Sequence, residues 1–133
     1  MTPLAAAAAQ EIEALHAHFV KLFTGRSVDL KRCAAAFSPA FTMVTPGGVK
    51  LDRAAILAGL AVLRAPTDFR IAIADIRPVW EGSNSALLQY VEQQYRDGKT
   101  TRRLSAALFE FEADAPCGVV WRYLHETWMR DAE

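Results

Sequence analysis

The dipeptide Asp97-Gly98, set between two long β-rich runs, constrains the fold more than any other feature of this sequence. A two-residue type I′ turn needs positive φ at both central positions, and Asp and especially Gly tolerate that conformation. The flanking runs are therefore predicted to form a hairpin in which Arg96 faces Lys99. Counting back from the turn predicts these further partners: Gln94 with Thr101, Glu92 with Arg103, Tyr90 with Ser105, and Leu88 with Ala107.

The predicted register gives the hairpin two different faces, because successive side chains of a strand alternate sides. The face that carries Glu92 opposite Arg103 is polar and aromatic. The other face is apolar and pairs Val91 with Leu104, Gln89 with Ala106, and Leu87 with Leu108. Dividing the last β-rich run in the same way assigns Trp121, Tyr123, His125 and Thr127 to the polar face, and Val120, Leu124 and Trp128 to the apolar face.

Helical patterns come before the β-rich part of the chain. Apolar residues at helical spacing predict one helix that starts near Pro3 and ends before Gly25, a second over 30–37, and a third that Asp52 caps. A short strand over 41–45 and a Pro-Gly-Gly turn separate the last two helices. Four β-rich runs follow at 69–80, 86–96, 101–111 and 119–129. This order predicts an α+β fold in which the four long strands form a meander.

Composition limits the classes of partner. The chain has 133 residues, 52% hydrophobic, and 15 basic side chains balance 15 acidic ones. We therefore expect a single domain over 1–133 and no nucleic-acid partner, because no broad positive field is available to hold a phosphate backbone. No run approaches the roughly 20 apolar residues that span a bilayer. Cys33 and Cys117 match no metal motif and do not suggest a disulfide framework, so we expect no metal and a cytoplasmic location. We also expect no cofactor.

Three helices can cover only one face of the predicted sheet. An uncovered apolar patch of this size would be unusual for a soluble monomer. We therefore expect a homodimer through the apolar face, with these residues in the interface: Leu87, Val91, Leu104, Leu108, Leu124 and Trp128.

The chain resembles a known superfamily in three fragments. They are Phe37 to Gly48, the RLSAALF run from Arg103, and the final strand from Trp121 to Trp128. The superfamily includes nuclear transport factor 2, SnoaL-like cyclases and ketosteroid isomerase. The resemblance implies a cystatin-like cone: three N-terminal helices in the concavity of a curved, mostly antiparallel sheet, with a cavity at the open end and commonly dimers through the convex face.

The resemblance does not carry over the isomerase chemistry. The base carboxylate of the isomerase falls on Thr45, its proton-donating carboxylate on Ala107, and its tyrosine near His18. That chemistry needs a carboxylate base and a protonated acid in an apolar site. Both carboxylates are absent, so steroid-type isomerisation is not expected.

His125 is the candidate acid/base, because histidine titrates near neutrality and the face analysis places it on the inner face near Ser105. A buried histidine with a purely structural role is the alternative. Glu92 and Arg103 either orient a polar ligand or brace two strands as an ion pair. Glu126 is expected to point away from His125, and either His16 or His18 can face the cone. The predicted cavity residues are His18, Thr45, Tyr90, Glu92, Arg103, Ser105, Trp121, Tyr123 and Thr127.

These features favour a protein that binds a small polar or aromatic metabolite in the cone, without an assigned activity. Two alternatives stay open at this point. One is a small isomerase, dehydratase or hydrolase-type enzyme that uses His125. The other is a non-catalytic module for dimerisation or assembly.

Overall fold

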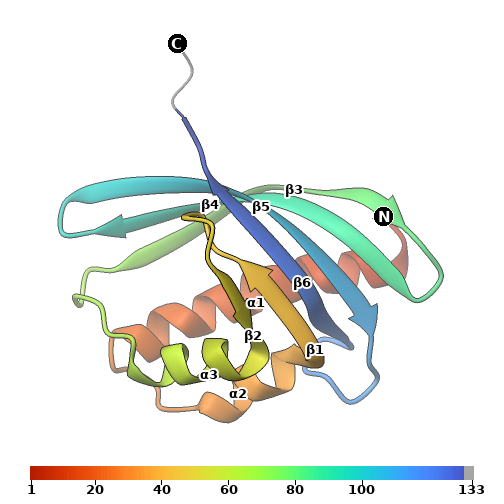
Figure 1. Cartoon of the computed structure of the whole chain (residues 1–133), viewed down its shortest axis with the longest axis horizontal. Helices are drawn as coiled ribbons and strands as arrows, with labels where there is room; N and C mark the ends of the chain where they lie inside the picture. Colours follow the sequence, from red (N-terminus) through yellow and green to blue (C-terminus); the bar gives the residue numbers. More distant parts are fainter. Residues whose placement is uncertain (131–133) are drawn as a thin grey trace.

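Three helices lie on one face of a curved six-stranded sheet, and a cone forms between the two layers (Figure 1). The computed structural model describes residues 1–130. The elements are α1 (Pro3–Phe23), α2 (Leu30–Ala36), β1 (Phe37–Val44), β2 (Lys50–Asp52), α3 (Arg53–Val62), β3 (Arg70–Glu81), β4 (Ser85–Arg96), β5 (Lys99–Phe111) and β6 (Val119–Trp128). The predicted α+β class and the placement of the helices against the curved sheet are confirmed.

Each helix begins at a side chain that accepts a hydrogen bond from its first turn. Thr2 Oγ1 accepts from the Ala5 amide at 3.1 Å, and Pro3 occupies the first helical position, where its missing N–H costs nothing. Asp29 caps α2 and Asp52 caps α3 in the same way. These caps set the helix starts close to the predicted positions.

The β4–β5 hairpin has the predicted register. Asp97 and Gly98 have φ values of +52° and +75°, as a type I′ turn requires. All eight predicted cross-strand pairs, five on the polar face and three on the apolar face, are present. The hairpin therefore places Glu92 opposite Arg103 on the concave face.

The predicted faces of the last strand are wrong beyond Trp121. Trp121 pairs with Phe109, whereas Tyr123 pairs with Leu108, so Arg122 is an extra residue that forms a β-bulge. Because a one-residue shift exchanges the two faces of a strand, every later side chain changes sides. Leu124, Glu126 and Trp128 therefore lie on the concave face, and Tyr123, His125 and Thr127 lie on the convex face.

The first strand differs from its prediction as well. The expected short strand over 41–45 is the end of a longer strand, β1, which starts at Phe37 directly after α2. It pairs parallel with β6, and the sheet order is β2-β1-β6-β5-β4-β3. A parallel pair between distant segments gives no local sequence signal. Phe37 and Phe41 are buried as a result and form one wall of the cone.

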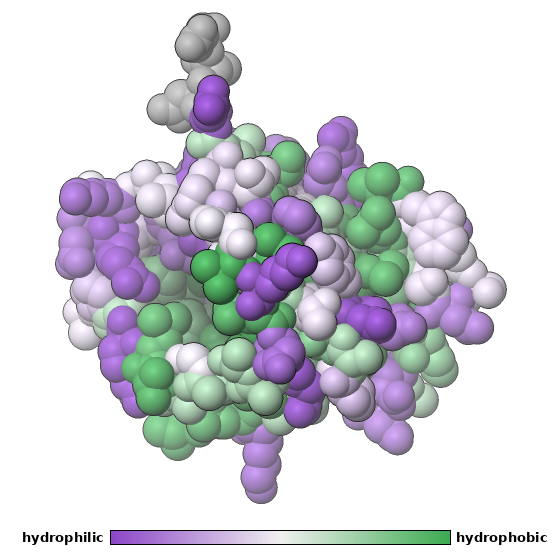
Figure 2. Space-filling view, in the orientation of Figure 1, coloured by the Kyte–Doolittle hydropathy of each residue, from purple (hydrophilic) through white to green (hydrophobic). Residues whose placement is uncertain are grey.

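The open end of the cone lies between α3 and the tip of the β4–β5 hairpin. Figure 2 shows apolar side chains in a hollow there, with hydrophilic side chains gathered over the hairpin tip beside it. No helix in residues 1–130 is long and apolar enough to cross a membrane.

Candidate functional site

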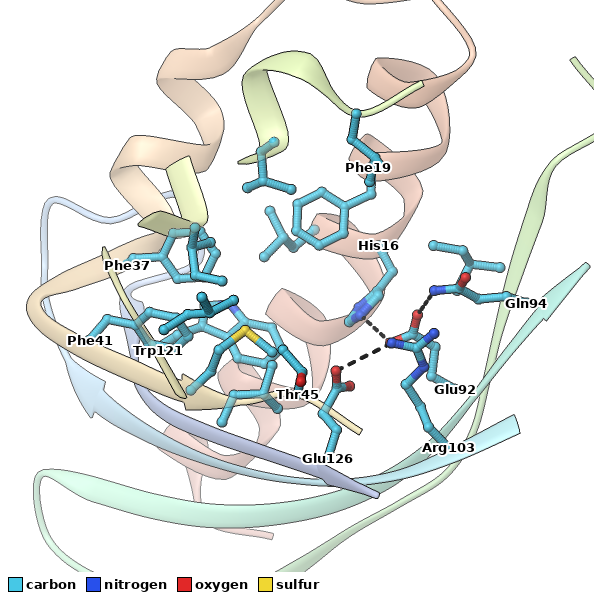
Figure 3. Close-up of a pocket in the computed structure, with 18 of the residues that line it drawn as sticks. His16, Phe19, Phe37, Phe41, Thr45, Glu92, Gln94, Arg103, Trp121 and Glu126 are labelled. Carbon is cyan, nitrogen blue, oxygen red and sulfur yellow. Dashed lines mark hydrogen bonds and ion pairs between the residues drawn. The ribbon is translucent and has the colours of Figure 1, made fainter. Parts of the chain in front are cut away.

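The cone encloses a cavity of about 240 Å³ with apolar walls and a charged floor (Figure 3). Helix α1 supplies one wall, α3 a second, and β1 and β6 a third. The apolar lining includes Leu15, Phe19, Phe37, Phe41, Met43, Ile56, Leu60, Trp121 and Leu124. The polar lining residues at the floor are His16, Glu92, Gln94, Arg103 and Glu126.

His16 reaches from α1 to the carboxylate of Glu92 on β4. Its Nε2 lies 3.0 Å from Glu92 Oε1, and its Nδ1 lies 2.7 Å from the carbonyl oxygen of Ile12. Gln94 Nε2 donates to the other carboxylate oxygen at 2.6 Å. Because both ring nitrogens of His16 face acceptors, the arrangement suits the doubly protonated imidazolium.

The environment favours charge on both members of this pair. Burial lowers the pKa of His16, but the charge and hydrogen bond of Glu92 outweigh it, and the pKa is raised from 6.5. Burial raises the pKa of Glu92, yet the charges of His16 and Arg103 and the hydrogen bonds from His16 and Gln94 lower it to about 2. The pair is therefore a buried ion pair near neutral pH.

Glu126 and Arg103 form the second half of the floor. Arg103 Nη1 lies 3.5 Å from Glu126 Oε1, and Ser105 Oγ donates to Glu126 Oε2 at 2.7 Å. Burial is the larger cause, and the negative charge of Glu92 the smaller cause, of a raised pKa for Glu126. The guanidinium of Arg103 lies 4.8 Å from the ring centre of Trp128, and its buried Nε has no hydrogen-bond partner in residues 1–130.

Four of the predicted cavity residues line the cavity: Thr45, Glu92, Arg103 and Trp121. Tyr90 and Ser105 lie fully buried on the concave face behind the floor, where burial raises the pKa of the Tyr90 phenol well above its ordinary value. Their inward orientation follows from the hairpin register.

The other predicted site residues lie outside the cavity. His18 Nε2 contacts the carbonyl oxygen of Asp29 at 2.8 Å, on the side of α1 that faces α2. The Arg122 bulge turns Tyr123, His125 and Thr127 to the convex face, and exposed His125 contacts the Tyr123 hydroxyl at 3.0 Å. The prediction that His125 faces the cavity is therefore wrong.

Sequence reasoning missed three of the polar floor residues. Helical spacing allowed His16 to face the cone but did not favour it over His18. Gln94 shares the face of Glu92, and the register alone was enough to find it. Glu126 gave no signal, because its inward direction depends on the bulge.

The floor offers paired charges rather than a ligand set for a metal. In the described part of the chain, no group of three His, Cys, Asp or Glu side chains could hold a metal ion. The available chemistry is hydrogen bonding from Arg103 and His16, and proton exchange with Glu126. The fold and site define a cone-shaped α+β protein with an apolar cavity that ends in buried ionisable groups.

Comparison with solved structures identifies the superfamily. An NTF-2 like protein of unknown function from Pseudomonas aeruginosa is 29% identical, with a TM-score of 0.85 over 93% of this chain and 99% of that chain. An NTF2-like protein of unknown function in nutrient uptake from Rhodospirillum rubrum is 18% identical, with a TM-score of 0.67 over 92% and 98%. The CaMKII hub of S. rosetta is 16% identical, with a TM-score of 0.76 over 92% and 95%. This chain belongs to the NTF2-like superfamily. No protein-family model and no curated protein matches it.

Proposed function

We propose that this protein binds a small, largely apolar or aromatic molecule in the cavity, with one polar group of that molecule against the charged floor. The observation that carries the proposal is the presence of a buried pair, His16–Glu92, and a partly buried pair, Arg103–Glu126, at the end of an apolar cavity. Buried ion pairs seldom stabilise a fold better than apolar side chains of similar volume. Recognition of a ligand explains four ionisable groups here better than stability does.

The size and lining of the cavity narrow the class of ligand. Its volume of about 240 Å³ lies below the roughly 300–1,000 Å³ of sites for drug-sized molecules. Aromatic side chains of α1, β1 and β6 suit a flat or compact apolar body. Arg103 presents a guanidinium to a carbonyl or carboxylate oxygen of the ligand. A small metabolite with one such group fits this combination.

A thermal-shift screen with a cavity-filling variant tests the proposal. The panel contains small carboxylic acids, ketones and planar aromatics, and a ligand at 100 times its Kd should add about 2.7 kcal/mol to the stability of the wild type. Leu60→Trp fills the cavity and should abolish these shifts. Ala58→Trp adds the same side chain at an exposed position of α3 and should preserve them. Shifts that survive Leu60→Trp would place binding outside the cavity and contradict the proposal.

Acid/base catalysis is a second candidate function, favoured by the two glutamates of the floor. The pKa of Glu92 is lowered and that of Glu126 is raised within one cluster, which is the pattern of a site with a separate base and acid. In this function Glu126 exchanges a proton with a bound carbonyl compound. Once a ligand from the screen is in hand, turnover should be lost in Glu126→Gln and kept in His125→Ala. Loss in both variants, or in neither, would count against this candidate.

We also propose that two copies of the chain pair through the convex face of the sheet. Leu87, Val91, Leu104 and Leu108 lie on this face, and no helix within residues 1–130 contacts it (Figure 1). Leu124 and Trp128, which we expected there, lie on the concave face instead. The similar S. rosetta structure is named a hub, and we take that name as support for pairing here.

Sedimentation of two charge variants tests the pairing. Leu104→Glu should convert a dimer to a monomer, because a charge would be buried in an apolar interface. Ala58→Glu, on exposed α3, should stay dimeric. A monomeric wild type at micromolar concentration, or a dimeric Leu104→Glu variant, would contradict pairing through this face.

A further inference from the structure

A groove leaves the cavity beside its charged floor and runs along the concave side of the β4–β5 hairpin. Its volume is about 410 Å³, and it shares Gln94 and Arg103 with the cavity. Its other lining residues are Arg96, Asp97, Lys99, Thr101 and Trp128. Figure 2 shows the hydrophilic side chains of this hairpin tip beside the apolar hollow. The cavity and the groove therefore adjoin at Gln94 and Arg103.

Positive charge predominates in the groove. Three basic side chains, Arg96, Lys99 and Arg103, line it with one carboxylate, Asp97. Arg96 and Lys99 are direct cross-strand partners, and like charges in that position destabilise a sheet. Arg103 already has Glu126, whereas Arg96 and Lys99 form no ion pair within residues 1–130. An anion bound at the tip would remove this repulsion.

We propose that this groove binds the terminal oxyanion of an elongated ligand whose apolar end occupies the cavity. The oxyanion is a carboxylate or a phosphate ester, and the inference rests on the proposed function of the cavity. The cross-strand pair Arg96–Lys99 lies four residues along each strand from the pair Glu92–Arg103. At ~3.3 Å per residue, the two pairs are about 13 Å apart.

Trp128 provides a surface for the part of the ligand between its two ends. The side chain is 50% exposed, lines the groove, and stacks against the guanidinium of Arg103. Thr101 faces Gln94 across the strands at the middle of the groove, where both offer hydrogen bonds. A ligand that runs from the floor to the hairpin tip thus passes from apolar walls over an aromatic and polar surface to two cations.

Calorimetric titration with a homologous series of probes tests this inference. The probes are straight-chain ω-phenylalkanoic acids from phenylacetic acid upward, their methyl esters, and the matching ω-phenylalkyl phosphates. Affinity of the acids should rise with chain length until the carboxylate reaches Arg96 and Lys99, and the ester of that length should bind about tenfold more weakly. Tighter binding of the phosphate than of the acid of equal length would identify a phosphate ester as the oxyanion.

Two variants of the hairpin locate the effect. Arg96→Gln with Lys99→Gln should weaken the longest acids about tenfold and leave phenylacetic acid and the esters unchanged. Arg102→Gln is the control, because it removes a positive charge from the convex side of the same hairpin, and it should leave all affinities unchanged.

The titrations distinguish a failure of oxyanion binding in the groove from a failure of ligand binding in the cavity. If acids and esters bind equally, or if the double variant binds long acids like the wild type, the groove is not an oxyanion site although the cavity still binds. If no acid binds, the inference is overturned, and the wider panel still tests the cavity. If Leu60→Trp binds every probe as the wild type does, the cavity is not the site and both proposals fall.

Discussion

Glu92 on β4 and Glu126 on β6 flank the same strand, β5, and their carboxyl groups have opposite protonation preferences. Glu92 faces Arg103 across the strands and accepts from His16 and Gln94, and its pKa falls to about 2. Glu126 faces Ser105, and burial and the charge of Glu92 raise its pKa. This asymmetry leads to distinct predictions for the two residues.

Glu92→Gln should lower the free energy of unfolding by about 3 kcal/mol at pH 7, because it removes the partner of a buried His16 cation. Urea denaturation measures the change. Glu13→Gln, at an exposed position of the same helix as His16, should stay within about 0.5 kcal/mol of the wild type. Similar losses of unfolding free energy in the two variants would show that the buried His16–Glu92 pair does not stabilise the fold more than an exposed glutamate does.

Glu126→Gln should cost far less, within about 1 kcal/mol of the wild type at pH 7. The charged form of this carboxyl is opposed by burial and by Glu92, so a neutral amide removes an unfavourable charge while it still accepts from Ser105. The same denaturation experiment compares it with Glu92→Gln. A loss as large as that of Glu92→Gln would mean that Glu126 is a tightly paired anion.

The combined contribution of Glu92 and His16 to the stability of the protein should be greatest between about pH 4.5 and 6.5. The pKa of Glu92 is lowered in the fold, so its contribution is present above 4.5 and is lost as the pH falls toward 2. The pKa of His16 is raised, so its contribution is present below 6.5 and is lost as the pH rises through the raised value. The pKa of Glu126 is raised, so its contribution is present below 4.5 and is lost as the pH rises through the raised value.

Thermal unfolding measured from well below pH 4.5 to well above pH 6.5 checks the profile. Glu126→Gln should reduce the loss on the alkaline side, and Glu92→Gln should flatten the acid side. A profile of Glu92→Gln that matches the wild type below pH 4.5 would exclude Glu92 as the group responsible.

His125→Ala should change stability by less than about 0.5 kcal/mol and leave cavity binding unaffected. The ring is exposed on the convex face and contacts only the Tyr123 hydroxyl among its side-chain hydrogen bonds in residues 1–130. Thermal shift of the variant with the best ligand of the panel measures both quantities. Loss of ligand binding would contradict the outward orientation of this residue.

Arg32→Met should destabilise the protein by about 3 kcal/mol, because it leaves Glu11 as an unpaired buried charge. Arg32 Nη2 lies 2.7 Å from Glu11 Oε1, and Trp121 Nε1 donates to Glu11 Oε2 at 3.0 Å. The double variant Glu11→Gln with Arg32→Met should recover most of the loss, since the amide oxygen still accepts from Trp121. Equal stabilities of the single and double variants in urea would contradict this account.

The features that could be predicted correctly from the sequence are those set by residues close together in the chain. The Asp97-Gly98 turn fixed the whole β4–β5 register, and with it the inward placement of Glu92, Tyr90, Arg103 and Ser105. Helix caps at Thr2 and Asp52 are equally local, because the capping side chain and the amide that it binds are three residues apart.

The remaining features required contacts between distant segments. Strand alternation assigns the two faces of β6 correctly only if no extra residue is inserted in the strand. The extra residue, Arg122, can be located only from the pairing of β6 with β5. The Arg122 bulge moved Glu126 into the site and His125 out of it. The parallel pairing of β1 with β6 closes the cone, and it depends on segments about 80 residues apart.

The sequence by itself determined the α+β class, the helix starts and the hairpin register, because each depends on side chains a few positions apart. Only the tertiary structure decided which glutamate and which histidine share the floor of the cavity. His16 meets Glu92 across the helix and sheet layers, and Glu126 meets Ser105 across two strands. Their pKa values follow from that joint burial, which no local pattern records.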